Sequence, residues 1–275
     1  MSTLYCYANH QIQPIEQWGV PVTDLWVQRG YGIFDFLRVA HDKPLFLEQH
    51  LERLFNSASI MHLTIKESKE EIKKIVAELI EKNKMPFSGI RMFVSGGDSA
   101  DGYTISAPRL VVLQQVLAVP DNQLSTKGIH LVSHPFQRQL AEVKTTDYLM
   151  AIWLQPWMKS LGADDILYYH KESITECPRS NIFMVTPENK LITPATQMLK
   201  GITRQNILKV AAAHQIEVEI RPIELAEIKT AKEVFISSST KRILPVSRLD
   251  DHFFPEISSN LISARLFSYL LELEQ

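Results

Sequence analysis

Apolar residues recur along this chain with two different periods, which predict helices and strands. From Leu47 to Ala58 they repeat every three or four residues, as on one face of a helix. A second stripe of this kind follows Glu67, and we expect that helix to end before Pro86, because proline cannot continue a helix. Short apolar runs predict strands at 34–39, 89–94 and 110–113.

The second half of the chain predicts a larger set of alternating elements. The turn cluster 119–122 (VPDN) indicates a domain boundary, so we expect a small N-terminal α/β domain over 1–120 and a large C-terminal domain over 121–275. Strands and helices alternate without a strict βαβ repeat. The predicted fold class is therefore α/β (α+β), with sheets that contain both parallel and antiparallel strands. The expected elements are strands at 129–133, 165–169, 181–185 and 234–237 and helices at 147–159 and 203–213.

Composition and charge narrow the functional classes. The 275 residues are 45% hydrophobic and 22% charged, which is typical of a folded globular protein. The net charge of -2 leaves no basic excess, so we expect neither nucleic acid nor an anionic membrane as partner. The most apolar stretch, 110–119, is too short to span a bilayer, and the N-terminus lacks the pattern of a signal peptide. The two cysteines, Cys6 and Cys177, indicate a reducing compartment, so we expect a cytoplasmic protein.

Three segments contain candidate phosphate ligands. Ile202 and Thr203 open a predicted helix just after a glycine, and the amides and dipole of a first turn attract anions. The alternative is that Thr203 only caps the helix. Ser238 and Ser239 follow a predicted strand, where hydroxyls and free amides commonly hold phosphate, although an ordinary polar turn has the same composition. Arg53 could supply a bidentate guanidinium or be a solvated helix arginine.

Two further residues are candidates for catalysis. Lys144 stands just ahead of a predicted helix, where a partly desolvated lysine can act as a Schiff-base nucleophile; a surface lysine is the alternative. Glu176 shortly precedes an apolar strand, and it would either keep a heterocyclic nitrogen protonated or be an ordinary turn carboxylate. Spacings typical of metal ligands and of nucleotide-binding loops are absent from the sequence, so no metal is expected. His134 is expected to be structural, and the pattern gives no role to Arg138, Asp147 and Tyr148.

Taken in order, these segments resemble the fold-type IV pyridoxal 5'-phosphate (PLP) enzymes, over about residues 24–246. That family contains branched-chain aminotransferases, D-amino-acid aminotransferases and aminodeoxychorismate lyases. The matching segments are 29–38 (RGYGIFDFLR), 46–54 (FLEQHLERL), 143–144 (VK), 175–183 (TECPRSNIF), 201–204 (GITR) and 235–246 (FISSSTKRILPV).

The resemblance implies that two lobes hold one cofactor, PLP. Lys144 would carry the cofactor as a Schiff base and would move the substrate α-proton as general base and acid. Glu176 would face the pyridine nitrogen and stabilise its protonated form. An amino acid then becomes a 2-oxo acid, and a second oxo acid takes the amino group in a ping-pong cycle. The implied phosphate ligands are Arg53, the amides of Ile202 and Thr203, and the hydroxyls of Ser238 and Ser239.

The mode of carboxylate binding is expected to decide which substrate this family member takes. The usual D-amino-acid enzymes carry an Arg-x-His pair, whereas here Arg91 is followed by Met92 and Phe93. Together with Arg29, Arg91 resembles the arginines of a non-standard D-amino-acid subgroup, in which two guanidinium groups form a fork for carboxylate. Structural ion pairs are the alternative for both arginines. We therefore predict a homodimeric D-amino-acid aminotransferase that uses 2-oxoglutarate or pyruvate as acceptor; a branched-chain L-amino-acid aminotransferase and a 4-amino-4-deoxychorismate lyase are the alternatives.

Overall fold

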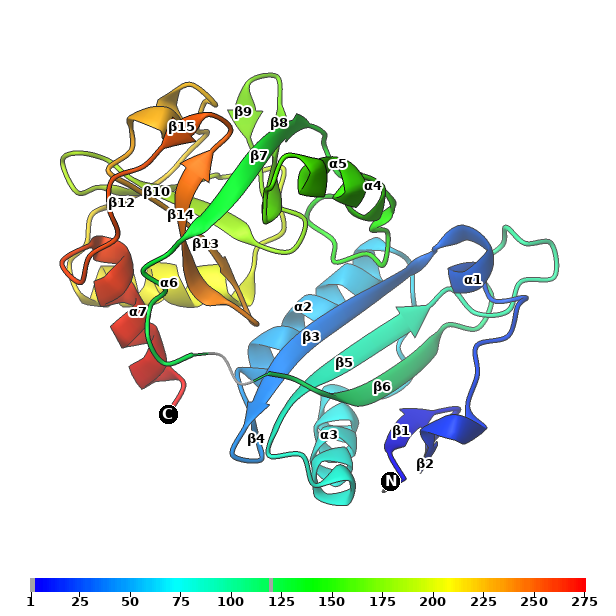
Figure 1. Ribbon diagram of the computed structural model, residues 1–275. Coiled ribbons are helices and arrows are strands. Elements are labelled where there is room, and N and C mark those ends of the chain that lie inside the picture. Colours follow the sequence, from blue (N-terminus) through cyan, green and yellow to red (C-terminus); the bar gives the residue numbers. More distant parts are fainter. Residues whose placement is uncertain (1–2, 119–120) are drawn as a thin grey trace. The chain divides into compact units, whose positions relative to one another are not determined.

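The computed structural model describes residues 3–118 and 121–275, which form two compact units (Figure 1). Unit 1 comprises Met1–Val119 and Val143–Asp147, and unit 2 comprises Pro120–Glu142 and Tyr148–Gln275. The predicted boundary cluster lies partly on residues 119 and 120, outside the described residues. The prediction that 121–275 form a single domain is wrong for one segment, Val143–Asp147, which packs with unit 1.

Unit 1 is built on a six-stranded antiparallel sheet. The strand order is β2-β1-β6-β5-β3-β4, and helices α2 and α3 pack against the sheet, as Figure 1 shows. The two long helices and three strands predicted for this part of the chain are confirmed. The strands are β1 Tyr5–Ala8, β2 Gln11–Pro14, β3 Gly32–Ala40, β4 Lys43–Pro44, β5 Phe87–Ser95 and β6 Arg109–Val116, and the helices are η1 Ile15–Gln17, α1 Leu25–Arg29, α2 Leu47–Ile60 and α3 Lys69–Asn83.

Local sequence signals explain the bounds of α3. Ser68 and Glu71 form a capping box, in which each side chain accepts a hydrogen bond from the backbone of the other residue. The helix ends at Lys84, which adopts a left-handed conformation two residues before Pro86. Its apolar face packs against β1 and β6 and joins the core of unit 1, while α2 packs against β3. The core of unit 1 therefore lies on this helix-covered side of the sheet.

Unit 2 is built on a nine-stranded mixed sheet. The order is β12-β11-β10-β13-β14-β7-β8-β9, with β15 paired to β14. The pairs β11–β12, β14–β7 and β7–β8 are parallel and the others antiparallel, so the predicted mixed sheet is confirmed. The strands are β7 Ile129–Pro135, β8 Asp165–His170, β9 Ser173–Ile174, β10 Asn181–Val185, β11 Leu191–Thr193, β12 Val218–Ile220, β13 Glu233–Ser238, β14 Arg242–Leu249 and β15 His252–Phe253, and the helices are α4 Leu149–Trp153, α5 Gln155–Ser160, α6 Ile202–Ala213, η2 Glu227–Thr230 and α7 Ile262–Leu273.

Proline interrupts one of the predicted helices of unit 2. The helix expected over 147–159 is divided into α4 and α5, because Pro156 stands in the first turn of α5 and cannot donate to the carbonyl of Ile152. α6 and α7 pack together against β13 and β14 around one apolar cluster. Within residues 3–118 and 121–275, no helix combines the length and the apolar character needed to cross a membrane.

Candidate active site

Lys144 is held by backbone hydrogen bonds between its segment and β3. The Phe34 amide donates to the Lys144 carbonyl oxygen at 2.9 Å, and the Thr146 amide donates to the Gly32 carbonyl oxygen at 2.9 Å. Val143 is buried in the core of unit 1, which fixes the segment from the other side. The Lys144 Nζ atom lies 4.7 Å from the centroid of the Phe34 ring. Lys144 therefore lies in a segment held by β3 and beside an aromatic ring. This environment disfavours the alternative of an ordinary surface lysine.

The strand register places Arg91 and three phenylalanines on one face of the sheet of unit 1. Phe34 is directly opposite Phe93, and Phe36 is directly opposite Arg91, and such pairs point to the same side of a sheet. The rings of Phe34 and Phe93 are stacked with centroids 5.9 Å apart. The guanidinium carbon of Arg91 lies 5.7 Å from the Phe36 ring centroid. Lys144, which contacts Phe34, thus borders an aromatic surface that also carries Arg91.

One nitrogen of Arg91 has no partner in this surface. Its Nε atom is buried and makes no hydrogen bond within the described part of the chain. Because an unpaired buried donor is costly, such a group commonly receives an acceptor from a ligand. Arg91 therefore has the chemistry expected of a residue that binds a carboxylate.

Arg29 lies in a different environment from Arg91. It is the last residue of α1, is exposed, and donates through Nη1 to the carbonyl oxygen of Gln28 at 2.9 Å. Gly32, where β3 begins, pairs with Ser95, which is four residues from Arg91 along β5. At about 3.4 Å per residue, this separation is about 14 Å of strand. The start of β3 is therefore separated from Arg91 by this length of strand, and the two-arginine fork and a substrate role for Arg29 remain predictions.

Arg53 is part of a buried ion-pair network rather than a solvated helix arginine. Its Nε and Nη2 atoms each donate to one oxygen of Asp35 at 2.8 Å, and His50 Nδ1 lies 2.6 Å from Asp35 Oδ1. Complete burial by itself raises the pKa of Asp35, but the charge of Arg53 and the hydrogen bonds from Arg53 and His50 outweigh it and hold that pKa well below its usual range. Burial lowers the pKa of His50. We therefore assign His50 as neutral, with its Nδ1 proton donated to Asp35.

The predicted anion site at the start of α6 differs in one detail from the sequence interpretation. The N-cap is Gly201, not Thr203, and Gly201 has no side chain with which to cap the first turn. The amides of Ile202 and Thr203 therefore lie at a helix terminus that its N-cap residue leaves uncapped, and the helix dipole there favours an anion. Gly201 is required, since a Cβ at this position would lie 2.2 Å from Asn181 Oδ1.

Asn181 holds the loop before α6, a role that the sequence pattern did not reveal. Its Nδ2 atom donates to the Leu199 carbonyl oxygen at 2.7 Å, and its Oδ1 atom accepts from the Gly201 amide at 3.2 Å. Asn181 also pairs with Ser237 across β10 and β13, one residue before Ser238. The loop that opens α6 and the turn containing Ser238 and Ser239 are thus connected through one residue.

The turn after β13 presents partly buried hydroxyls. Ser238 and Ser239 are half-buried, and the Ser238 hydroxyl accepts a hydrogen bond from the Lys241 amide at 3.3 Å. The neighbouring Ser237 hydroxyl is buried and has no partner within the described residues. This turn and the start of α6 supply the hydroxyls, free amides and dipole that suit a phosphate group.

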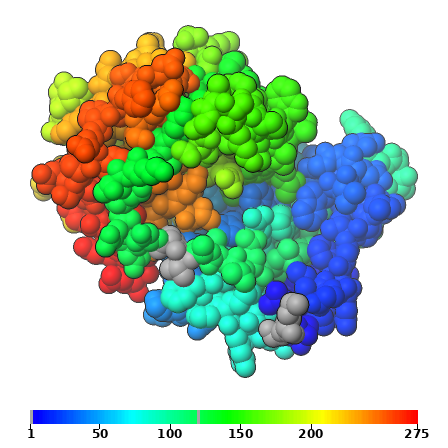
Figure 2. All heavy atoms as spheres, viewed as in Figure 1, coloured from blue at the N-terminus to red at the C-terminus, as the bar shows by residue number. Residues whose placement is uncertain are grey.

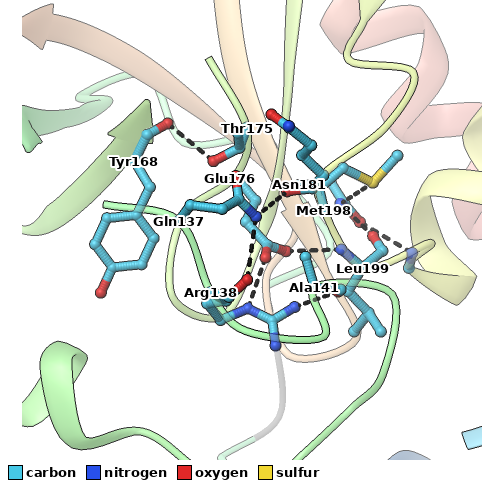
Figure 3. A network of polar contacts seen from close by, with 11 residues as sticks. Gln137, Arg138, Ala141, Tyr168, Thr175, Glu176, Asn181, Met198 and Leu199 are labelled. Atoms are coloured by element: carbon cyan, nitrogen blue, oxygen red, sulfur yellow. Dashed lines mark hydrogen bonds and ion pairs between the residues drawn. The ribbon is translucent and has the colours of Figure 1, made fainter. Parts of the chain in front are cut away.

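Glu176 lies at a crossing of three loops in unit 2 (Figure 3). Arg138 Nε donates to Glu176 Oε1 at 2.7 Å, and the Leu199 amide donates to Oε2 at 3.0 Å. The carboxylate is nearly buried, with 7% of its side chain exposed. A carboxylate oxygen can accept more than one hydrogen bond, so a buried carboxylate of this kind suits a donor such as a protonated pyridine nitrogen.

The residues present fit a phosphorylated pyridine such as PLP. Unit 1 contains Lys144 and Arg53, and unit 2 contains Glu176 together with the candidate phosphate ligands around α6 and β13. Among the described residues, no group of three or more histidine, cysteine or acidic side chains could hold a metal ion. The sequence already contained one signal for the network around Arg53, namely the charged Asp35 between the two phenylalanines of β3.

Comparison with known proteins places the chain in a family. The model of the class IV aminotransferases matches residues 32–249. A D-alanine aminotransferase of Listeria monocytogenes is 28% identical over 96% of this chain and 93% of its own length. A probable branched-chain-amino-acid aminotransferase of Rickettsia bellii is 30% identical over 90% of this chain and 87% of its own length. The crystal structure of a T.th. branched-chain amino acid aminotransferase with pyridoxamine 5'-phosphate has a TM-score of 0.89, with 20% identity over 100% of this chain and 95% of that one.

This chain belongs to the class IV aminotransferases. It has the fold-type IV architecture, its cofactor is PLP, and its substrates are amino acids and oxo acids. The D-alanine and the branched-chain relatives are similar to it to about the same degree, so the family alone does not select a substrate.

Proposed function

We propose that this aminotransferase moves amino groups from D-amino acids to 2-oxoglutarate or pyruvate in a ping-pong cycle. When bound, PLP supplies an electron-accepting ring that takes up the electron pair released with the substrate α-proton. Lys144 is the attachment point of the cofactor and moves that proton as general base and acid. Glu176 accepts a hydrogen bond from the protonated pyridine nitrogen. Arg53, the amides of Ile202 and Thr203, and the hydroxyls of Ser238 and Ser239 bind the phosphate.

Arg91 is the observation that supports this substrate class. A guanidinium with a buried, unpaired Nε atom suits a carboxylate, and it projects from the same sheet face as the ring that contacts Lys144. We propose Arg91 for the substrate carboxylate and the exposed Arg29 for a second carboxylate, as in D-glutamate.

A branched-chain L-amino-acid aminotransferase is the second candidate. The aromatic surface beside Arg91 favours it, because Phe34, Phe36 and Phe93 offer apolar contacts to a branched side chain. The same surface would accept the apolar side chain of a D-amino acid. The stereochemistry at the α-carbon therefore separates the two candidates.

A half-reaction panel tests the proposal. Purified protein loaded with PLP is mixed separately with D-glutamate, D-alanine, L-leucine and L-glutamate, and the 2-oxo acid formed in one turnover is measured. We expect D-glutamate and D-alanine to react at least about tenfold faster than either L-amino acid, a difference of about 1.4 kcal/mol in the reaction barrier. Rapid reaction with L-leucine and none with the D-amino acids would instead establish the branched-chain candidate.

The Arg91→Gln variant extends the same panel. Loss of a charge-assisted bond to carboxylate corresponds to about 2 kcal/mol, so we expect the KM for the preferred amino acid to rise by roughly 30-fold. Arg248→Gln is the control, because its ion pair with the fully exposed Asp251 lies at the surface. An unchanged KM in Arg91→Gln would remove Arg91 from the substrate site.

We also propose that the protein is a homodimer. Helix α4 exposes large apolar side chains, with Ile152 63% and Trp153 69% exposed, and this segment lies on the face seen in Figure 2 (green). Clustered exposed apolar side chains of this kind commonly mark a protein interface. The occupant that we propose for this surface is a second copy of the chain.

Light scattering on the purified protein tests the dimer. We expect a mass of twice the 31.5 kDa of one chain, and a monomer for the Trp153→Glu variant because the substitution places a charge in the interface. Ile220→Glu, at an exposed position of β12 in the same unit, is the control and should leave the mass unchanged. A wild-type protein that remains monomeric would refute the proposal.

The state of the cysteines supports a cytoplasmic location as part of the proposal. Cys6 and Cys177 are both buried and free. Free buried thiols are typical of proteins in reducing compartments.

A further inference from the structure

Arg138 contacts Glu176 directly. Its Nε atom donates to Glu176 Oε1 at 2.7 Å, and its Nη2 atom donates to the Ala141 carbonyl oxygen at 2.5 Å. Only 16% of the Arg138 side chain and 7% of the Glu176 side chain are exposed. Figure 3 shows the guanidinium directed at the carboxylate from the loop that follows β7. The ion pair is therefore largely shielded from water.

The geometry restricts the carboxylate from two sides. Arg138 holds one oxygen and the Leu199 amide holds the other, at 3.0 Å. The Leu199 loop is itself fixed, because Asn181 accepts from the Gly201 amide and donates to the Leu199 carbonyl oxygen. The orientation of Glu176 thus depends on a side-chain cation and on a loop that also begins the phosphate-binding helix α6.

We propose that Arg138 is a positioning residue for the cofactor: it keeps the Glu176 carboxylate ionised and oriented toward the pyridine nitrogen. The proposal rests on the role of Glu176 in the proposed function. A cation within hydrogen-bond distance favours the charged form of a carboxylate, whereas burial without a partner favours the neutral form. A neutral Glu176 would not stabilise a protonated pyridine nitrogen, and the ring would accept electrons less well.

The structure also separates this role from that of a purely structural arginine. Arg248 makes the same two kinds of contact in unit 2, since its Nε atom donates to a carbonyl oxygen, of Asp250, and its Nη2 atom pairs with Asp251. The Asp251 side chain is fully exposed, so the charge of Arg248 is screened by water. Arg248 is therefore a matched control for loss of an arginine from the same unit.

The test is a double-mutant cycle on PLP affinity, which requires no substrate. Dissociation constants for PLP are measured between pH 5 and 9 for the wild type, Arg138→Met, Arg138→Lys, Glu176→Gln and Arg138→Met/Glu176→Gln. We expect Arg138→Met to weaken PLP binding by roughly 10- to 100-fold and Arg138→Lys to recover part of the loss. In the profile of PLP affinity against pH, we also expect the loss of affinity on the acid side to begin about one pH unit higher in Arg138→Met than in the wild type. In the Glu176→Gln background, Arg138→Met should have no further effect.

Two controls decide how the cycle is interpreted. The thermal midpoint of each variant without PLP shows that it is folded, and Arg248→Met should bind PLP as the wild type does. The proposal would be overturned if Arg138→Met reduced PLP affinity equally in the wild-type and Glu176→Gln backgrounds. It would also be overturned if Arg138→Met left the PLP affinity and its pH profile unchanged. Because the cycle measures PLP binding alone, it can succeed even if the half-reaction panel refutes a D-amino-acid substrate.

Discussion

Replacement of Lys144 by alanine is expected to reduce amino-group transfer by at least about 10³-fold, the largest loss of any single substitution in this chain. The side chain serves as both the attachment point and the proton carrier, so one substitution removes two functions. The backbone of the segment is fixed to β3 independently of the side chain, through the Phe34 amide and the Thr146 amide. The fold should therefore survive the change.

Two measurements check the Lys144 prediction. Borohydride reduction of the wild type followed by peptide mass analysis should find the cofactor on the peptide that contains Lys144, and the Lys144→Ala variant should have no such peptide. The single-turnover yield of 2-oxo acid gives the rate loss. Lys241→Ala is the control, because Lys241 pairs with Asp165 in unit 2. A Lys144→Ala protein that transfers amino groups at the wild-type rate would contradict the prediction.

The substitution Asp35→Asn should have the largest effect on stability. Asp35 is completely buried, and its two oxygens receive two hydrogen bonds from Arg53 and one from His50. Removal of its charge leaves the Arg53 guanidinium, of which 10% is exposed, without its counter-ion. Loss of one partner from a buried pair commonly costs about 3–5 kcal/mol, and we expect the free energy of unfolding to fall by about that amount. Urea denaturation at pH 7 measures it.

The pH dependence gives a second signature of Asp35. Because its pKa is lowered in the folded state, Asp35 contributes its full stability above its unfolded pKa of about 3.9 and loses that contribution as the pH falls toward the folded pKa. The difference in unfolding free energy between wild type and Asp35→Asn should therefore be constant above about pH 5 and shrink below about pH 4.

A matched exposed carboxylate serves as the control for Asp35. Glu48→Gln, on the same helix as His50 and Arg53, removes a half-exposed partner of Lys73 and should change stability far less. A difference between wild type and Asp35→Asn that does not shrink at low pH would show that the stabilisation does not depend on the charge of Asp35.

Helix and strand positions in this protein could be predicted from local patterns. Helices α2, α3 and α6 and strands β3, β5, β6, β8, β10 and β13 lie where the apolar patterns predict them, because each buries at least one face and β10 is buried throughout. The single helix expected over 147–159 was wrong because Pro156 overrides the apolar pattern. The start of α6 was predicted one residue too late, at 203, because the helix begins at Ile202, directly after its N-cap Gly201.

Ion-pair partners could not be predicted from sequence. Arg138 and Glu176 are 38 residues apart and Asp35 and Arg53 are 18 apart, and no local rule relates such positions. The sequence marked Arg53 as a candidate phosphate ligand, but only the fold shows that a buried carboxylate already fixes its guanidinium. The unpaired Nε atom of Arg91 is likewise visible only after the strands are in register.

The sequence by itself determined the family motifs, their order and the residue types that the chemistry requires. Side-chain chemistry and local spacing are properties of the chain, so Lys144, Glu176 and the glycine before α6 could be identified without coordinates. The tertiary structure alone decided which charges meet: it grouped the Lys144 segment with unit 1 and brought Arg138 to Glu176. The physical reason is that a buried charge is tolerated only beside a partner, and distant segments become partners only when the chain folds.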